Sequence, residues 1–345
     1  PFWQHCTTLM KIFSYTDRHF GIPPDYLSGK DWPVQFHEGF SKFYHEYYQG
    51  DIIIVHDSES NAWLPFHRIL NRLARFGQIL HPPVVNGKEL EPDGQEKFVN
   101  NLMSLLHDHI LIHRFIQPHP FGMMLASPAG SKSIRFGTYI TDLTEYMDDE
   151  KLLYSFDPKY RKAVQHSIKN EAKIVFGQCA YDDFYKLYSM TAQRTGMYKD
   201  PVEYFQLLRR YLGETNTETG VVYDGDQPIG GIFMVYSEYA AFCTHAGSGG
   251  ESKLYGGMKL LHYEMMKLLR DRGVKKYDLV GVRIGGHNPA LEGVFRFKRG
   301  FGGQLKEGYL WKADIDGLHL KLYDMMSKLK NPNLKPDIID QESEE

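Results

Sequence analysis

The segment from Gly293 to Gly303 combines residue types that could stabilise negative charge during a group transfer. It reads Gly-Val-Phe-Arg-Phe-Lys-Arg-Gly-Phe-Gly-Gly, so three cations alternate with phenylalanines between glycines. Consecutive residues of a helix point in different directions, and the three cations therefore cannot all face one side. A lysine that turns inward beside an apolar wall can stabilise the oxyanion of an acyl-transfer transition state. The alternative to a catalytic lysine is a structural one, in which the segment is a basic helix end capped by glycine.

A second candidate is the glycine-rich loop from Ala246 to Lys253, which leads into an amphipathic helix predicted from Ser252 to Arg272. The backbone N–H groups of such a loop can bind an anion, for example the pyrophosphate of CoA. No basic residue stands at the start of the loop, and Glu251 would repel phosphate. The sequence therefore favours a flexible connection over a CoA site.

A third candidate is the basic face of a helix predicted from Asp157 to Ala172, which starts with an Asp-Pro pair suited to a helix N-terminus. Arg161, Gln165 and Lys169 recur every four residues and so share one face. This face could bind phosphate, and a solvated helix face accounts for the same spacing.

Four histidines near residue 110 could suggest a metal site. His109 and His113 are four residues apart, and His107 and His119 are close by. The run from Ile110 to Phe115 predicts a strand, which would separate residues four apart by about 13 Å. No HExxH motif or carboxylate partner for metal ligation accompanies them. We expect structural or exposed histidines and no metal site.

Composition limits the classes of protein that remain. The 345-residue chain has 40 Lys and Arg against 43 Asp and Glu, so a large basic nucleic-acid surface is not expected, although a local basic groove is possible. Three scattered cysteines exclude a disulfide framework and fit a reducing, cytoplasmic location. No apolar run approaches the roughly 18 residues of a spanning helix.

The chain is long for a single hydrophobic core, and we predict two domains. We assign residues 1–147 to the first domain, 148–332 to the second and 333–345 to an acidic tail, and we expect residues 337–345 to be disordered. Both domains are predicted as α/β, with mixed, mostly antiparallel sheets flanked by helices. In the second, a strand meander, a helix, a strand, a helix and a final strand follow the order of a GNAT-type N-acyltransferase fold, and the first could be a degenerate copy.

Several segments of the second half resemble the FemABX peptidoglycan aminoacyltransferases and their FemAB-like relatives. The most specific is Gly293 to Gly303, which is similar to the family's G-x-x-x-F-K-x-G-F-G-G signature. The others resemble the family's basic helix, T-x-x-R-x-G, D-G-x-x-x-x-G and Y-D-x-x-G segments, and they are Tyr160–Lys173, Thr191–Gly196, Asp224–Gly230 and Tyr277–Gly281.

The resemblance implies two tandem GNAT-like domains, of which the first has lost the acyl-donor site. It also implies transfer of an amino acid from aminoacyl-tRNA to an amine of a peptidoglycan precursor peptide, with neither metal nor CoA as a cofactor. The family's Phe-Lys pair maps onto Phe297 and Lys298, and this lysine would stabilise charge as the ester is attacked. Candidate substrate-binding residues are Arg161, Lys169, Arg194, Arg296, Arg299, Phe301 and Tyr309.

The expected partners are the acceptor end of a charged tRNA and a UDP- or lipid-linked precursor, with peripheral contact to the inner face of the membrane. We expect a monomer. Two alternatives stay open. One is a FemAB-like N-acyltransferase that uses acyl-CoA in envelope polysaccharide biosynthesis, and the other is a pseudo-acyltransferase that binds a ligand without catalysis.

Overall fold

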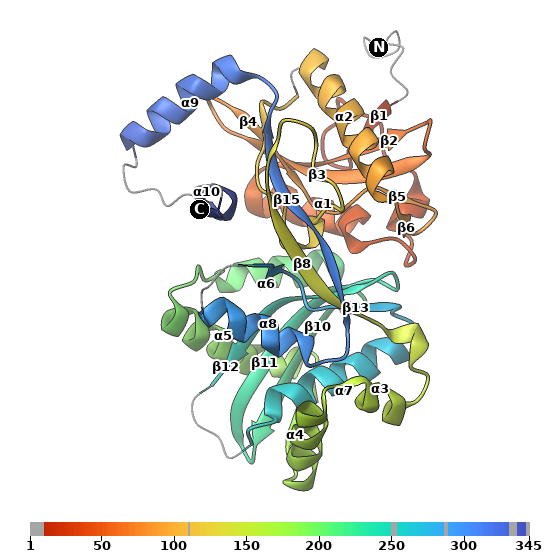
Figure 1. Cartoon of the computed structure of the whole chain (residues 1–345), viewed down its shortest axis with the longest axis vertical. Coiled ribbons are helices and arrows are strands. Elements are labelled where there is room, and N and C mark those ends of the chain that lie inside the picture. The colour runs from red at the N-terminus through yellow and green to blue at the C-terminus, as the bar shows by residue number, and fades with distance from the viewer. Residues whose placement is uncertain (1–9, 110, 250–253, 286–288, 331–336, 343–345) are drawn as a thin grey trace. The chain divides into compact units, whose positions relative to one another are not determined.

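The computed structural model describes residues 10–109, 111–249, 254–285, 289–330 and 337–342, and the chain divides into two compact units (Figure 1). Unit 1 contains Pro1–Gly29, Gln35–Gly137 and Glu307–Glu345, and unit 2 contains Lys30–Val34 and Thr138–Lys306. The sequence analysis placed the boundary after residue 147 and kept residues up to 332 in the second domain. In the structure, the chain from Glu307 onward packs with unit 1.

Unit 1 is built on a sheet with the strand order β1-β2-β3-β4-β7-β15, in which neighbours are antiparallel except β4 and β7. Phe98, Leu102 and Leu106 of α2 pack against the sheet residues Val55 and Phe66 to form its core. The helices are α1 (Glu38–Tyr48), α2 (Pro92–His109), α9 (Gly317–Lys330) and α10 (Ile338–Glu342). The strands are β1 (Met10–Phe13), β2 (Asp51–Asp57), β3 (Ala62–Leu70), β4 (Arg75–Ile79), β5 (Val84–Val85), β6 (Lys88–Glu89), β7 (Arg114–Phe115) and most of β15 (Gln304–Asp314).

Two predictions for unit 1 are wrong. Of the strand expected from residue 110 to 115, residue 110 lies outside the described residues and β7 begins only at Arg114, because α2 continues to His109. The expected disordered tail contains α10, whose Ile339 is fully buried in a small apolar cluster with Met123 and Leu310. Lys312 pairs with Asp337 and Asp340, so the acidic residues beside α10 are partly neutralised.

Unit 2 is built on a sheet with the order β8-β13-β12-β11-β10-β9, in which only β12 and β13 run parallel. The predicted α/β class, with mixed, mostly antiparallel sheets and flanking helices, is confirmed. The strands are the part of β8 (Lys132–Asp142) from Thr138 onward, β9 (Lys173–Phe176), β10 (Thr217–Asp224), β11 (Gln227–Tyr236), β12 (Ala241–Ser248), β13 (Lys276–Asp278) and β14 (Val282–Arg283). The helices are α3 (Asp149–Ser155), α4 (Pro158–Lys169), α5 (Tyr181–Thr195), α6 (Val202–Leu212), α7 (Gly257–Asp271) and α8 (Pro289–Arg299).

The two faces of the unit 2 sheet are covered by different helices, as two adjacent glycines of β11 demonstrate. A Cβ atom on Gly230 would lie 2.3 Å from Met258 Sδ of α7, and one on Gly231 would lie 3.2 Å from the Phe184 Cα of α5. Successive residues of a strand point to opposite faces. Helix α7 therefore packs on one face and α5 on the other, and both helices leave no room for larger side chains at these two positions (Figure 1).

None of the helices in the described ranges is both long and apolar enough to cross a bilayer.

Gly302 and Gly293 provide a test of how unit 2 is packed around the end of α8. Gly302 has φ +72°, and a Cβ there would lie 2.3 Å from the Ser155 carbonyl oxygen, whereas Gly293 lies on α8 with nothing within 4 Å. We expect Gly302→Ala to lower the free energy of unfolding by about 1–3 kcal/mol, and Gly293→Ala to raise it by about 0.5–1 kcal/mol because alanine favours the helix. Urea unfolding of both variants measures the difference, and equal effects would contradict this packing.

Candidate functional site

Lys298 lies near the C-terminal end of α8, and its ammonium is held by backbone carbonyls. Its Nζ donates to the carbonyl oxygens of Val280 and of Gly281, the latter at 2.6 Å. An ammonium carries three N–H donors. One donor therefore remains for a further acceptor, since the described residues supply no third partner. The lysine of the Gly293–Gly303 signature thus does turn inward, as the sequence analysis expected.

The turn that carries these two carbonyls has an unusual backbone. Val280 has φ +50° and Gly281 has φ +58°, so two successive residues are left-handed. For a β-branched residue such as valine this conformation is costly and persists only where the surrounding structure enforces it. Asp278 supplies that constraint, because its Oδ1 accepts the Val280 N–H at 2.7 Å and also the hydroxyl of Thr138. Asp278 thereby positions the turn that holds Lys298.

The groups around Lys298 are buried and electrostatically coupled. Burial lowers the pKa of Lys298, and burial raises the pKa of Asp278 despite its hydrogen bonds. Burial likewise raises the pKa of the Cys243 thiol on β12 to about 12 and lowers the pKa of His262 to about 3, the latter with a contribution from the Lys298 charge. Charge on Lys298 is therefore unfavourable here unless an opposite charge forms nearby.

An aromatic wall stands beside the lysine. The Phe297 ring lies 5.1 Å from Phe301 and 5.8 Å from the imidazole of His262 on α7. Tyr160 of α4 donates its hydroxyl to the Phe297 carbonyl at 3.1 Å, and a Cβ on Gly300 would meet the Tyr160 ring at 2.4 Å. The wall fixes the C-terminal end of α8 against α4 and α7, and the glycine at position 300 makes that approach possible.

Next to this wall, strands β12 and β13 of the unit 2 sheet separate. The parallel strands β12 and β13 pair at Ala241–Tyr277 and Phe242–Asp278, and no further pair joins them in the described structure. Beyond Asp278 the chain stays with β8, because the Leu279 N–H donates to the Tyr139 carbonyl at 3.1 Å. The edge of β12 from Cys243 to Ser248 can therefore offer backbone hydrogen bonds to an extended ligand, and Lys298 is anchored just past the last pair.

Arg194 and Thr191 anchor the far end of β12. Arg194 donates to the Ser248 carbonyl and hydroxyl at 3.3 Å and 3.0 Å, and the Ser248 N–H donates to Thr191 Oγ1 at 2.9 Å. The T-x-x-R-x-G segment thus fixes the point where the glycine-rich loop begins. Residues 250–253 of that loop, including the expected helix start at Ser252, lie outside the described residues, and α7 begins at Gly257.

The remaining predicted residues do not all gather at Lys298. Phe301 is fully buried and packs on Phe156, so its ring belongs to the core of unit 2. Arg161 donates to the Tyr154 carbonyl at 2.7 Å and lies over the Tyr154 ring.

The other cations are exposed. Lys169 lies at the C-terminal end of α4, and Arg296 and Arg299 lie on α8 with Lys298. Arg296 is 4.0 Å from Glu292. Tyr309 belongs to unit 1, where its backbone pairs with Met124. Of the predicted set, the structure therefore brings together Phe297, Lys298 and Phe301, with Arg296 and Arg299 on the same helix.

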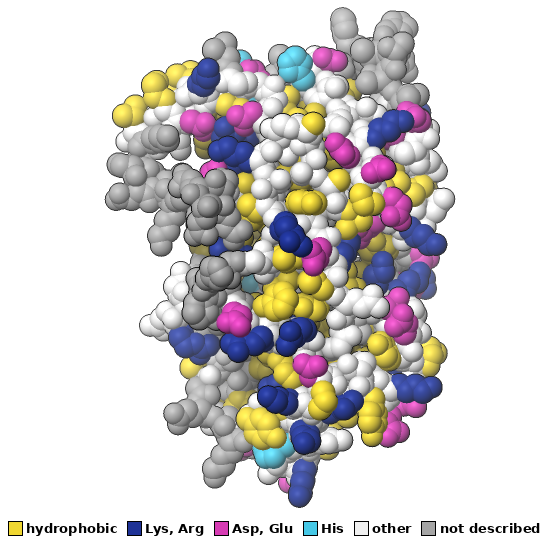
Figure 2. Space-filling view, viewed as in Figure 1, with side chains coloured by type: hydrophobic (Ala, Val, Ile, Leu, Met, Phe, Trp, Pro, Cys, Tyr) yellow, Lys and Arg dark blue, Asp and Glu magenta, His cyan; other side chains and the backbone are white. Residues whose placement is uncertain are grey.

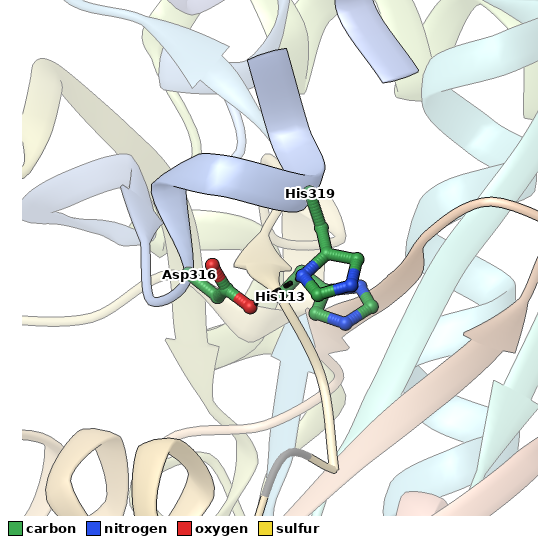
Figure 3. A group of neighbouring side chains, drawn as sticks. All are labelled: His113, Asp316 and His319. Atoms are coloured by element: carbon green, nitrogen blue, oxygen red, sulfur yellow. Dashed lines mark hydrogen bonds and ion pairs between the residues drawn. The ribbon is translucent and has the colours of Figure 1, made fainter. Parts of the chain in front are cut away.

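The histidine region of unit 1 contains a group that the sequence did not reveal. His113, Asp316 and His319 place their nitrogen and oxygen ligand atoms within 4.8 Å of one another (Figure 3). The His113 Nδ1 accepts the Arg75 N–H at 2.9 Å, which places the ring proton on Nε2, and the His319 Nδ1 is 2.7 Å from Asp316 Oδ2. The two rings stack 4.8 Å apart at 9°. The group lies at the start of α9, where Asp316 and His319 are joined by a side-chain hydrogen bond, and the proton on Nε2 of His113 opposes metal ligation there.

Sequence reasoning did not single out His262, Thr138 or Val280. His262 is buried in α7, where its Nδ1 lies 2.7 Å from the Tyr277 hydroxyl. The Tyr277–Gly281 segment carried the available signal, because an aspartate followed three residues later by glycine suggests a turn at a strand end. Thr138 and His262 come from distant parts of the chain and carry no local signal.

Comparison with known proteins agrees with this geometry. The family model of the acetyltransferase (GNAT) domain matches residues 159–299. The chain is 24% identical over 178 residues to the UDP-N-acetylmuramoylpentapeptide-lysine N(6)-alanyltransferase of Weissella viridescens, a match that covers 51% of this chain and 52% of that protein. The crystal structure of FemX superimposes with a TM-score of 0.61 at 14% identity, covering 84% of this chain and 93% of FemX.

Unit 2 thus has the fold of a GNAT-type acyltransferase domain. The resemblance to Fem-like proteins stated from the sequence motifs is confirmed. The sequence match spans about half the length of the alanyltransferase.

The buried His262 predicts a pH dependence of stability. Its pKa is lowered to about 3 in the folded protein, whereas an unfolded histidine titrates near about 6.5. Between pH values equal to these two pKa values, the histidine is protonated in the unfolded state and neutral in the folded state. The contribution of His262 to the free energy of unfolding is therefore complete above about pH 6.5, and it falls by about 1.4 kcal/mol for each pH unit below that.

Urea unfolding between pH 7 and pH 5 measures this slope. The variant His262→Gln should have a shallower slope than the wild type, and the exposed His107→Gln should not. The same slope in all three proteins would show that His262 is not held neutral by burial.

Proposed function

We propose that the protein transfers an amino acid from aminoacyl-tRNA to an amine of a peptidoglycan precursor peptide. The observation that carries the proposal is the Lys298 ammonium, held by the Val280 and Gly281 carbonyls beside the opening between β12 and β13. The Weissella alanyltransferase adds support, because its name describes transfer of alanine to a lysine of a UDP-linked muramoylpentapeptide.

The reaction is aminolysis of the ester at the 3′ end of the tRNA. The neutral acceptor amine forms a bond to the ester carbonyl carbon, an oxyanion develops, and the C–O bond to the ribose breaks. The proton lost by the amine ends on the released hydroxyl. An ammonium whose charge is disfavoured by burial gains most when the oxyanion forms, so Lys298 stabilises the transition state more than the ground state.

Asp278 is not the general base of this scheme. Its Oδ1 already accepts two hydrogen bonds from within the protein, from the Thr138 hydroxyl and from the Val280 N–H. Its contribution is to hold the strained turn, and positioning of the reactants with the charge of Lys298 supplies most of the rate.

The proposal extends to the donor, the partners and the location. No metal or CoA takes part, the acceptor is UDP- or lipid-linked, and the monomeric protein acts in the cytoplasm, where charged tRNA is available. The absence of a basic residue at the start of the Ala246–Lys253 segment supports tRNA over CoA. The exposed cations Arg296 and Arg299 on α8 are suited to the phosphates of the acceptor end.

The test is the release of free tRNA from alanyl-tRNA, and from other charged tRNAs, in the presence and absence of UDP-muramoylpentapeptide. We expect release that depends on the precursor and a product heavier by one aminoacyl group. Acylation of the precursor from acetyl-CoA without tRNA would favour the CoA-dependent alternative. Stabilisation by the precursor without any turnover would favour the pseudo-acyltransferase.

Substitution of Lys298 tests its role in this assay. We expect Lys298→Ala to lower kcat by about 10²–10³-fold, the usual cost of losing one oxyanion donor. Lys298→Arg should recover little, because the planar guanidinium cannot reproduce the position of Nζ between two carbonyls. Glu292→Gln, an exposed change on the same helix, is the matched control. Wild-type rates for Lys298→Ala would refute the role of this lysine.

A further inference from the structure

Helix α9 of unit 1 presents apolar side chains on two opposite sides. Leu320 and Tyr323 pack inward on Ala74 and Phe76, where Leu320 is 1% exposed. Leu322, Met325 and Leu329 lie three, four and seven residues apart on the other side, and they are 50%, 56% and 76% exposed. Residues at these spacings share one face of a helix. The outward face of α9 is therefore an apolar strip with no partner among the described residues.

Basic residues accompany this strip. Lys321 of α9 is exposed, and the single acid of the helix, Asp324, is held by Arg114 at 3.1 Å. The acids just before the helix are also engaged, since Asp314 pairs with Arg114 and Asp316 with His319. The local charge that is free to act on a ligand is therefore positive.

The turn between β3 and β4 continues this surface. Ala74 belongs to the same apolar cluster as Leu320, which places the turn beside α9. Within the turn, Leu70 is 51% exposed and Leu73 is 36% exposed, and the exposed Arg72 lies between them. Figure 2 shows hydrophobic side chains gathered along α9. The helix and the turn thus combine protruding apolar side chains with cations.

We propose that α9, together with the turn from Leu70 to Leu73, docks on the surface of a lipid bilayer that contains anionic lipids. An apolar helix face with cations such as Lys321 and Arg72 beside it is the pattern of helices that lie in the plane of a membrane interface, with the apolar side chains among the acyl chains and the cations at the headgroups. A protein partner would need an apolar groove lined with acidic residues. An anionic bilayer offers both an apolar interior for the strip and negative headgroups for the cations. The inference assigns the membrane contact expected from the sequence to a surface of unit 1, and vesicle binding tests it separately from acyl transfer.

The test measures binding of the full chain to sucrose-loaded vesicles by cosedimentation. Vesicles of phosphatidylcholine alone are compared with vesicles containing equal amounts of phosphatidylglycerol and phosphatidylcholine. The wild type should partition at least about tenfold more strongly onto the anionic vesicles, because each cation near an anionic surface adds roughly fivefold, and high salt should reduce this preference.

Two sets of substitutions separate the apolar and the charged contributions. The triple variant Leu322→Ser, Met325→Ser and Leu329→Ser should lose at least about tenfold in partitioning, with unchanged thermal unfolding because these side chains are exposed. The double variant Arg72→Gln and Lys321→Gln should lose the preference for anionic lipid while it keeps the apolar strip. The matched control substitutes three exposed apolar residues elsewhere by serine, namely Ile22, Met147 and Met197.

Four outcomes of these experiments would overturn the proposal. It fails if the wild type does not bind anionic vesicles, if it binds neutral vesicles equally well, or if the triple variant binds like the wild type. It also fails if sedimentation shows a dimer that the triple variant dissociates, since the strip would then be a contact between two copies of the chain. Loss of transfer activity with intact vesicle binding would affect only the proposed function.

Discussion

The burial of one lysine ammonium against a left-handed turn constrains much of unit 2. Lys298 donates to the carbonyls of Val280 and Gly281, and both residues have positive φ, which is costly for a β-branched valine. The Asp278 carboxylate offsets this cost by accepting the Val280 N–H, and Thr138 holds the carboxylate. Strand β13, the turn and α8 therefore form one interdependent set, and the ammonium is placed by backbone atoms rather than by a flexible side chain.

The surrounding elements serve that placement. The aromatic wall of Tyr160, Phe297 and Phe301 fixes the end of α8, and α7 contributes the neutral His262 behind it. On the other side of the opening, Arg194 ties β12 to α5. Between these two anchored structures, β12 has an edge from Cys243 to Ser248 to which no described strand pairs. The chain has nearly equal numbers of acidic and basic residues, and this arrangement concentrates polar groups around Lys298 without requiring an extended basic surface.

The elements that sequence analysis missed share physical causes. Strand β3 contains Pro65, which lacks an N–H and usually argues against an interior strand, yet its carbonyl still accepts the Leu80 N–H. Helix α9 is apolar on two sides, so it lacks the single apolar stripe that identifies a surface helix. The tail residue Ile339 finds its partners in a cluster formed by distant segments. Phe301 was assigned to a substrate-binding surface but lies in the core of unit 2. Aromatic character alone does not distinguish a ring in the core from a ring that binds a ligand.

The sequence by itself determined the order of helices and strands in the second half, the Gly293–Gly303 signature and the resemblance to Fem-like proteins. It could do so because helical and strand periodicity, turn glycines and short motifs are encoded by residues a few positions apart. Only the tertiary structure decided which atoms surround the lysine. Val280 and Lys298 are 18 residues apart, and Thr138 and Asp278 are 140 residues apart. Such contacts depend on how whole elements pack, and local patterns in a single sequence do not specify that packing.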